Sequence, residues 1–238
     1  MTAISPRAWQ VVLDAVELEL LEGRLSPGDH LPPERTLAAD LGVGRSSVRE
    51  ALRVLEVLGL IRTAVGSGPS AGAIIVARPG GGMSALMRLQ VAAQGFAVAD
   101  VVKTRLVLEG SIVTDLAEAC RTSSPDLTSS EQILTVMQNQ ALTEAEFLAL
   151  DAQFHLSLAE ASGNQVITAT MAGLRSAIEG YARAGAAGLA SWPATSARLM
   201  LEHRGILTAI VAGQADAARL AVQAHISGYY AETHLTKH

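Results

Sequence analysis

The chain of 238 residues lacks the features that mark secreted, disulfide-stapled or membrane-spanning proteins. Its single cysteine, Cys120, excludes an internal disulfide framework and favours a reducing compartment. No apolar run approaches the roughly 20 residues of a membrane-spanning helix, and the N-terminus has no basic segment followed by an apolar one. We therefore expect a soluble protein of the cytoplasm that has no membrane partner.

Proline is also scarce, with 8 residues, whereas 49% of the chain is hydrophobic. This composition is sufficient for buried cores in one large or two modest domains. The only plausible linker is the run Pro79-Gly80-Gly81-Gly82. We therefore predict a first domain at residues 1–78, a linker at 79–84 and a second domain at 85–238.

A helix-turn-helix pattern lies in the first domain. A short helix with Leu37 and Leu41 on its apolar face stops at the glycine turn 42–44, and a second apolar-periodic helix begins at once. The first turns of such a second helix present polar side chains to DNA bases while the apolar stripe packs behind them. The residues in these turns are Arg45, Ser46, Ser47 and Arg49.

The flanking segments fit a winged form of this pattern. Residues 7–22 predict an amphipathic helix, and Pro32-Pro33-Glu34 opens the next helix. The apolar runs 60–61 and 74–76 flank a glycine-rich segment at 66–72, which predicts a two-stranded wing with a flexible tip. A glycine-rich tip can approach a phosphate backbone or enter a minor groove.

The arginines of this region could instead form a solvated helix face, which is the usual role of a charge run. Residues 45–62 contain four arginines (45, 49, 53 and 62) against two glutamates (50 and 56), although the whole chain has a net charge of −5. Arginines on one helical turn beside a glycine turn and a wing favour DNA contact. The contribution of phosphate contacts to DNA affinity grows with the number of contacts. Since the basic character of this chain is only local, we expect two subunits to bind the DNA together.

The segment 31–61, LPPERTLAADLGVGRSSVREALRVLEVLGLI, resembles the winged helix-turn-helix of GntR-type bacterial transcription regulators. The resemblance implies operator contacts by three arginines, phosphate or base contacts by two serines, and a glycine near the wing tip. These residues are Arg35, Arg45, Arg49, Ser46, Ser47 and Gly66. Several relatives place a histidine at the tip, where this chain has Val65-Gly66, and this departure puts base reading by the wing in doubt.

The rest of the chain predicts helices only. Breakers such as Ser123-Ser124-Pro125 and Gly213 separate the expected spans, which are 83–93, 98–121, 126–141, 144–162, 164–185, 193–212 and 215–235. The expected fold class is therefore mainly α. It combines an N-terminal winged helix-turn-helix domain with a C-terminal, all-α antiparallel bundle of about six or seven helices.

Polar residues interrupt the apolar stripes of three of these helices. Asp151 and His155 stand at i and i+4 in one stripe, while His203 and His225 lie in the stripes of the last two helices. Buried carboxylates and imidazoles are costly unless they are paired or bound to metal. Together they could supply one oxygen and three nitrogens to zinc, nickel, manganese or iron. From spacing alone, a metal site and a hydrogen-bonded core cluster remain alternatives.

Most of residues 85–235 resemble the FadR-like C-terminal ligand-binding domain called FCD. The resemblance lies in Asp151-Ala-Gln-Phe-His155, Ala161-Ser-Gly-Asn164, Glu202-His203 and His225. It implies a divalent metal ion, zinc before nickel or manganese, and a small organic acid or acyl compound as effector. The implied metal ligands are Asp151, His155, His203 and His225.

Two further residues are candidates for effector binding. Arg105 interrupts the stripe of the helix expected at 98–121, and a buried guanidinium needs an anionic partner. That partner could be an internal acid such as Glu109 or Asp151. In the resembled family the arginine of an Arg-x-x-x-Glu helix lines the pocket, which implies a clamp for an effector carboxylate. Asn164 is a weaker candidate and could simply cap the following helix.

The function that these patterns favour is a ligand-responsive transcription regulator, a repressor rather than an enzyme. A homodimer would place two recognition helices on a double-stranded operator with an inverted repeat. One alternative is a structural bundle that is stabilised by the metal, only dimerises the DNA-binding domain and binds no effector. Another is a metal-dependent enzyme, against which no separate general base, nucleophile or Gly-rich phosphate loop accompanies the ligands.

Overall fold

A computed structural model of the chain describes residues 7–64, 72–76, 81–93 and 96–233. The chain divides into two compact units, Met1–Met83 and Ser84–His238, and each has a hydrophobic core of its own. The expected fold class is confirmed: the first unit is a winged helix-turn-helix and the second is helical.

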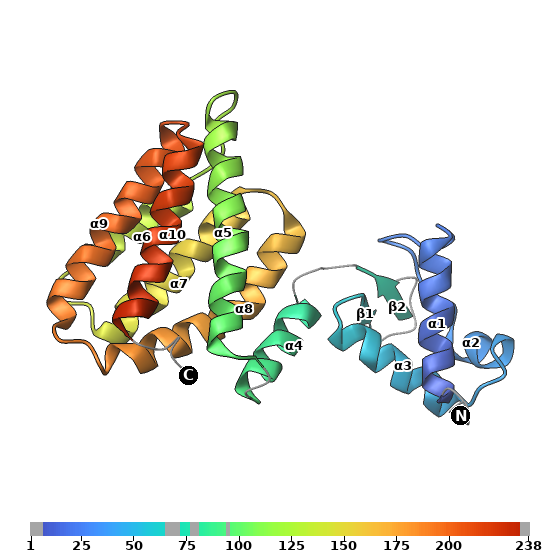
Figure 1. Ribbon diagram of the computed structural model, residues 1–238. Helices are drawn as coiled ribbons and strands as arrows, with labels where there is room; N and C mark the ends of the chain where they lie inside the picture. Colours follow the sequence, from blue (N-terminus) through green and yellow to red (C-terminus); the bar gives the residue numbers. More distant parts are fainter. Residues whose placement is uncertain (1–6, 65–71, 77–80, 94–95, 234–238) are drawn as a thin grey trace, which may run out of the picture. The chain divides into compact units, whose positions relative to one another are not determined.

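The described part of the first unit consists of helices followed by a small sheet (Figure 1): α1 (Ala8–Leu21), α2 (Glu34–Asp40), α3 (Arg45–Val57), β1 (Ile61–Ala64) and β2 (Gly72–Ile75). Val48, Leu52 and Leu55 form the buried stripe of α3 and share a core with Val12 and Val16 of α1. Each such side chain contributes about 1.5–3 kcal/mol when it is fully buried. This packing holds the inner face of α3 and leaves its outer face in solvent.

A tight turn separates α2 from α3. Gly42 has φ +63°, a left-handed conformation that glycine adopts without the steric cost of a side chain. Gly44 then serves as the N-cap of α3 in extended conformation. The wing strands pair antiparallel, with Ile61 opposite Ile75, and both isoleucines are buried. The expected wing-tip residue, Gly66, lies outside the described residues.

The helices that follow are α4 (Gly81–Ala92), α5 (Val98–Cys120), α6 (Thr128–Met137), α7 (Glu144–Ala161), α8 (Gln165–Ala186), α9 (Trp192–Val211) and α10 (Ala215–Glu232). Figure 1 shows α10 between α5 and α9, and its most extensive packing is against these two helices. Helix α7 packs along α8. Inward-facing side chains fill the shared interior, among them Leu116, Phe154, Leu199, Ile206 and Val222.

Local capping explains where helices begin and end. Thr143 caps α7 through a reciprocal capping box with Glu146, as its sequence spacing favours. The expected helix 126–141 was wrong at both ends, since α6 covers only Thr128–Met137. The Asp126 side chain accepts a hydrogen bond from the Thr128 amide, and Asn139 accepts one from the Ala141 amide. Such local turns compete with the helical backbone and stop it on either side.

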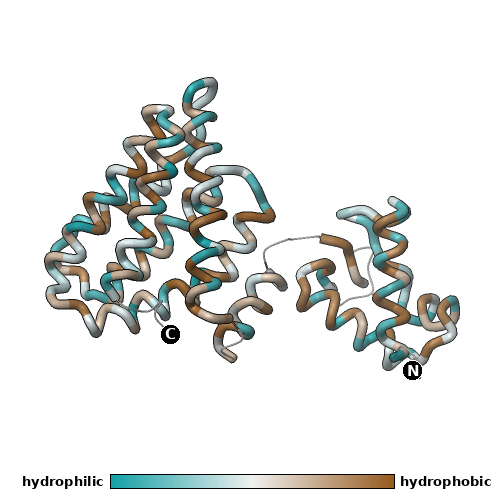
Figure 2. Tube along the Cα trace, viewed as in Figure 1, coloured by the Kyte–Doolittle hydropathy of each residue, from teal (hydrophilic) through white to brown (hydrophobic). Residues whose placement is uncertain are grey.

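Hydrophobic and hydrophilic residues are interleaved along the helices, as the brown and teal segments of Figure 2 show. Within the described residues, no helix is both long enough and apolar enough to cross a membrane.

Candidate metal centre

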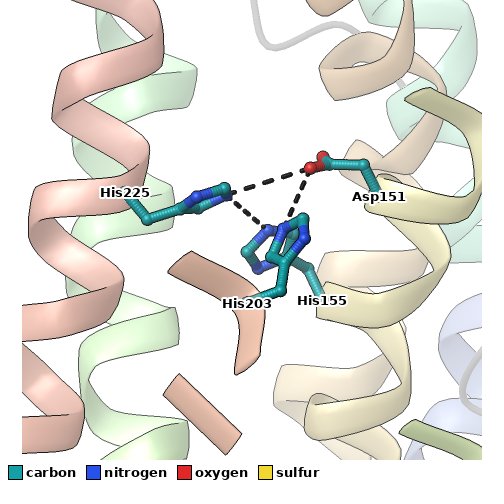
Figure 3. Close-up of side chains that lie close together, drawn as sticks. All are labelled: Asp151, His155, His203 and His225. Carbon is teal, nitrogen blue, oxygen red and sulfur yellow. Dashed lines mark hydrogen bonds and ion pairs between the residues drawn. The ribbon is translucent and has the colours of Figure 1, made fainter. Parts of the chain in front are cut away.

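Four polar side chains from three helices meet inside the second unit (Figure 3). Asp151 and His155 stand one turn apart on α7, His203 comes from α9 and His225 from α10. All four are buried, with exposed fractions of 7% for Asp151, 1% for His155, 0% for His203 and 3% for His225. One potential ligand atom of each lies within 4.8 Å of those of the other three.

The interatomic distances show how these side chains converge. Asp151 Oδ1 lies 3.0 Å from His203 Nε2 and 3.9 Å from His225 Nε2. The Nε2 atoms of His155 and His225 face each other at 3.1 Å. His203 Nε2 makes no hydrogen bond within the described residues, despite its short distance to Asp151. A central cation would satisfy these lone pairs together, so one oxygen and three imidazole nitrogens fit a divalent metal such as zinc.

Two carboxylates stand behind the histidines. Glu109 Oε2 on α5 lies 2.5 Å from His155 Nδ1, and Glu202 Oε2 on α9 lies 2.8 Å from His225 Nδ1. A proton on Nδ1 leaves the lone pair of Nε2 for the centre, which is the arrangement that metal-binding histidines commonly adopt. His203 Nδ1 has no hydrogen-bond partner in the part of the chain described.

Arg105 is buried, with 4% of its surface exposed, and forms an internal ion pair. Its Nε donates to Glu109 Oε1 at 2.6 Å, and its Nη1 donates to the Tyr230 hydroxyl at 3.5 Å. Its Nη2 has no partner among the described residues. Glu109 is therefore the acid that pairs with Arg105, and the Nη2 group of the guanidinium remains without a hydrogen-bond partner.

That arginine shares a small cavity with two of the metal-ligand candidates. The cavity has a volume of about 10 Å³, room for roughly one water molecule. It is lined by Arg105, Leu148, Asp151, Ala182, His225, Ile226, Tyr229 and Tyr230. Asn164 is not among them. Its exposed side chain caps α8, accepting hydrogen bonds from the amides of Val166 and Ile167 at 3.1 and 3.2 Å.

The electrostatics of the cluster suit a metal. Burial, together with the neighbouring imidazoles, lowers the pKa of His225 to about 4, and burial also lowers the pKa of His203. Burial opposes ionisation of Asp151, but His203 and the other imidazoles bring its pKa well below the usual range. Burial likewise opposes ionisation of Glu109, but Arg105 and a histidine hold its pKa at about 2. At neutral pH the cluster therefore offers the ionised carboxylate of Asp151 and the neutral imidazoles of His203 and His225, as metal binding requires.

The metal-free protein should lose stability as the pH falls below about 6.5. Unfolded histidines take up protons near 6.5, whereas folded His225 does so only near 4, so the unfolded state binds more protons in this window. Above 6.5 the residue is neutral in both states and contributes nothing. For His225 alone, the loss should be on the order of 2 kcal/mol by pH 5. Urea unfolding of chelator-treated protein at pH 7.5, 6.5, 5.5 and 5 measures it.

Comparison of two histidine variants tests whether His225 causes this dependence of the free energy of unfolding on pH. His225→Leu should reduce the slope, whereas His30→Leu, which removes an exposed histidine of the first unit, should change it little. The pKa of His203 is also lowered, so part of the slope should survive in His225→Leu. An identical slope in wild type and His225→Leu would refute the assignment.

Comparison with known families covers both units. The model of bacterial regulatory proteins of the gntR family matches residues 9–69, and the FCD domain model matches residues 100–228. The chain belongs to the GntR family. It has the GntR helix-turn-helix and the FCD domain that its sequence motifs resemble, so it is a DNA-binding transcription regulator.

Similar proteins cover nearly the whole of this GntR regulator. The repressor NanR of Citrobacter rodentium is 30% identical, over 94% of this chain and 85% of the relative. The Glc operon transcriptional activator of Escherichia coli strain K12 is 28% identical, over 91% and 85%. The Streptococcus agalactiae GntR structure aligns with a TM-score of 0.62 and 26% identity, over 93% of this chain and 97% of that one. These relatives are regulators rather than enzymes, as expected from the sequence.

The candidate DNA-contacting residues of the GntR unit lie around the start of α3. Arg45, Ser46 and Ser47 form its first turn, and only Ser47 is half-buried. Arg35 in the first turns of α2 is exposed as well. Arg49 is exposed and donates to Glu34 Oε2 of α2 at 2.8 Å, a pairing that the sequence analysis did not foresee. An exposed ion pair contributes about 0–1 kcal/mol, so a phosphate or base can replace it at little cost.

Two carboxylates beside the candidate metal centre contact its histidines, and the sequence motifs did not identify them as histidine partners. Glu109 was considered only as the salt-bridge partner of Arg105, and Glu202 only as the neighbour of His203 in a motif. A signal was present in both cases, because Glu109 stands four residues before Val113, and Glu202 stands three residues after Leu199 and four before Ile206, which is the spacing of an apolar helix face. An acid in such a place needs a partner inside the bundle.

Proposed function

We propose that this GntR protein is a ligand-responsive regulator whose FCD bundle binds one divalent metal ion, zinc in preference to nickel or manganese. Its ligands would be Asp151, His155, His203 and His225. One observation carries the proposal: four buried ligand atoms converge within 4.8 Å, and His203 Nε2 points at this centre without a hydrogen bond. Bound there, the ion would take an acid effector as a fifth ligand, because zinc can expand its coordination beyond four.

The effector that fits this centre is a small organic acid. Arg105 lines the cavity together with Asp151 and His225, and its Nη2 has no partner among the described residues, so a carboxylate bound there could reach both the guanidinium and the ion. The cavity of about 10 Å³ is too small for such an acid. Binding must therefore open the bundle, and an acid that prefers the opened arrangement shifts the population towards it by its differential affinity.

We further propose that the protein binds an inverted-repeat operator as a homodimer and acts as a repressor. Two copies place two α3 helices on two half-sites one helical turn apart, or a multiple of that spacing. The proposed sign of regulation is supported by the 30% identical relative, NanR, which is a repressor. The outer face of α3, which the core leaves exposed, would read the bases.

Arg45→Ala and Arg49→Ala should each weaken operator binding by about 1–3 kcal/mol, roughly 5- to 150-fold. Both arginines lie on the exposed face of the first turns of α3, where contacts to guanine edges are made. Arg35→Ala should weaken binding to all duplexes alike, because we expect that residue to contact phosphate. Fluorescence anisotropy measures these affinities on a duplex selected by the wild-type protein from a random library, and on a scrambled duplex.

Arg24→Ala provides the matched control for this series. Arg24 is an exposed arginine of the same unit that follows α1, lies outside the helix-turn-helix segment and pairs with Glu19, so its removal should leave operator affinity unchanged. If Arg45→Ala and Arg49→Ala bind the selected duplex as tightly as Arg24→Ala does, these residues do not form the reading surface.

The small size of the cavity favours a second candidate function. The cavity has room for only one water molecule, so the metal could serve only to stabilise the bundle. The domain would then dimerise the protein and bind no effector. Operator affinity that responds to no acid would support this reading over the ligand-responsive one.

A further inference from the structure

The same five-residue pattern occurs on two helices beside the metal centre. It reads Arg105-Leu-Val-Leu-Glu109 on α5 and Arg198-Leu-Met-Leu-Glu202 on α9. The spacing i, i+4 places arginine and glutamate on one helix face. In both copies an arginine nitrogen lies 2.6 Å from Oε1 of the glutamate four residues later.

The second oxygen of each glutamate faces a histidine of the cluster. Oε2 of Glu109 lies 2.5 Å from Nδ1 of His155 as an ion-pair contact without hydrogen-bond geometry, and Oε2 of Glu202 is hydrogen-bonded to Nδ1 of His225 at 2.8 Å. Each carboxylate thus bridges an arginine on its own helix and an imidazole on another. Helix α5 reaches α7 in this way, and α9 reaches α10.

We propose that the two Arg-Leu-x-Leu-Glu segments are paired positioning devices, each aiming the Nε2 atom of one histidine at the metal. The arginine fixes the carboxylate, and the carboxylate fixes the Nδ1 proton and the ring orientation, which also makes Nε2 a more basic ligand. This inference rests on the metal site of the proposed function. It assigns Glu109 and Glu202 as positioning residues rather than metal ligands.

The two devices differ in what surrounds them. The Arg105–Glu109 pair is deeply buried, with side-chain exposures of 5% and 3%, against 36% and 29% for Arg198–Glu202. Arg198 also pairs with Glu232 at the end of α10, whose Oε1 accepts a hydrogen bond at 2.8 Å from the Thr195 hydroxyl. The second device therefore ties the start of α9 to the end of α10, the two helices that carry His203 and His225.

Glu202 offers the cleaner test. Removal of Glu109 would leave the Arg105 charge buried without its partner, and such a loss strongly destabilises a fold. Glu202 is partly exposed, so its removal leaves an arginine that water can solvate. Any change in metal binding by Glu202→Ala then reports on His225 rather than on a collapsed bundle.

The experiment measures zinc affinity by competition with a chromogenic chelator, using the full-length protein. Glu202→Ala should bind zinc 10- to 100-fold more weakly than wild type. Glu202→Gln should lose less, because its amide oxygen can still accept a hydrogen bond from the Nδ1–H group of His225. The absorption bands of bound Co²⁺ provide a second readout, and Glu202→Ala should shift them, since the geometry at His225 changes.

Arg183→Ala is the matched control, because it breaks an i, i+4 pair with Glu179 of the same 2.6 Å length on α8. Its zinc affinity and Co²⁺ spectrum should equal those of the wild type. If Glu202→Ala matches Arg183→Ala in both readouts, the positioning role is overturned while the metal site stands. If wild-type protein takes up neither zinc nor Co²⁺, the proposed metal function fails, and this inference fails with it.

Discussion

Zinc uptake of up to one equivalent per chain in the wild type should fall to a small fraction of that in His203→Ala and in His225→Ala. Each change removes one of only three imidazole ligands from a fully enclosed set, and the remaining groups cannot close the coordination sphere. Zinc at 100 times its dissociation constant stabilises a folded protein by about 2.7 kcal/mol, and this gain should vanish in both variants. Elemental analysis and thermal unfolding with and without chelator measure the two effects.

His30→Ala serves as the control for these variants, since it removes an exposed histidine of the first unit and should leave metal content unchanged. Wild-type protein that remains metal-free after incubation with zinc, nickel or manganese would contradict the prediction. The four residues would then form a hydrogen-bonded core cluster.

A small hydroxy- or keto-acid should raise the melting temperature of the metal-loaded wild type and change its operator affinity by roughly 5- to 150-fold, whereas Arg105→Lys should not respond. Arg105 Nε donates to Glu109, its Nη2 has no partner among the described residues, and the residue lines the cavity. A lysine ammonium would stay with Glu109 and lacks the second arm of the planar guanidinium. A thermal-shift screen of acids, followed by operator titrations, tests this expectation.

Lysine is preferred to alanine at this position. Arg105→Ala would leave Glu109, which is 2% exposed, as a buried charge without its partner, and the bundle could unfold for that reason alone. Arg183→Lys on the exposed face of α8 is the control and should respond as the wild type does. An Arg105→Lys protein that responds normally would limit Arg105 to its internal ion pair. A screen in which no acid binds the wild type would favour the dimerisation domain without an effector.

The features that could be predicted from the sequence are those set by residue spacing within a single helix. Asp151 and His155 share a helix face by spacing alone, and the start of α3 follows from the glycine turn. The ends of α6 were missed because the turns at Asp126 and Asn139 carry a weaker signal than the apolar period. The role of the wing tip stays a prediction from family resemblance.

The remaining features depend on how helices cross. The contact between Glu202 and His225 requires a particular pairing of α9 with α10, and the residue spacing along either helix does not encode it. The same holds for Glu109 and His155, which come from α5 and α7. Sequence periodicity could place each of these groups inside the bundle, but it could not say which of them meet.

The complete burial of the centre has a kinetic consequence. With exposures of 7% or less for all four candidate ligands, an ion held among them can enter or leave only when helices part. Its exchange would then be as slow as the opening of the bundle, whatever the concentration of free metal outside. Such an ion would exchange slowly with free metal, so chelator competition and metal removal must be followed until the metal content no longer changes.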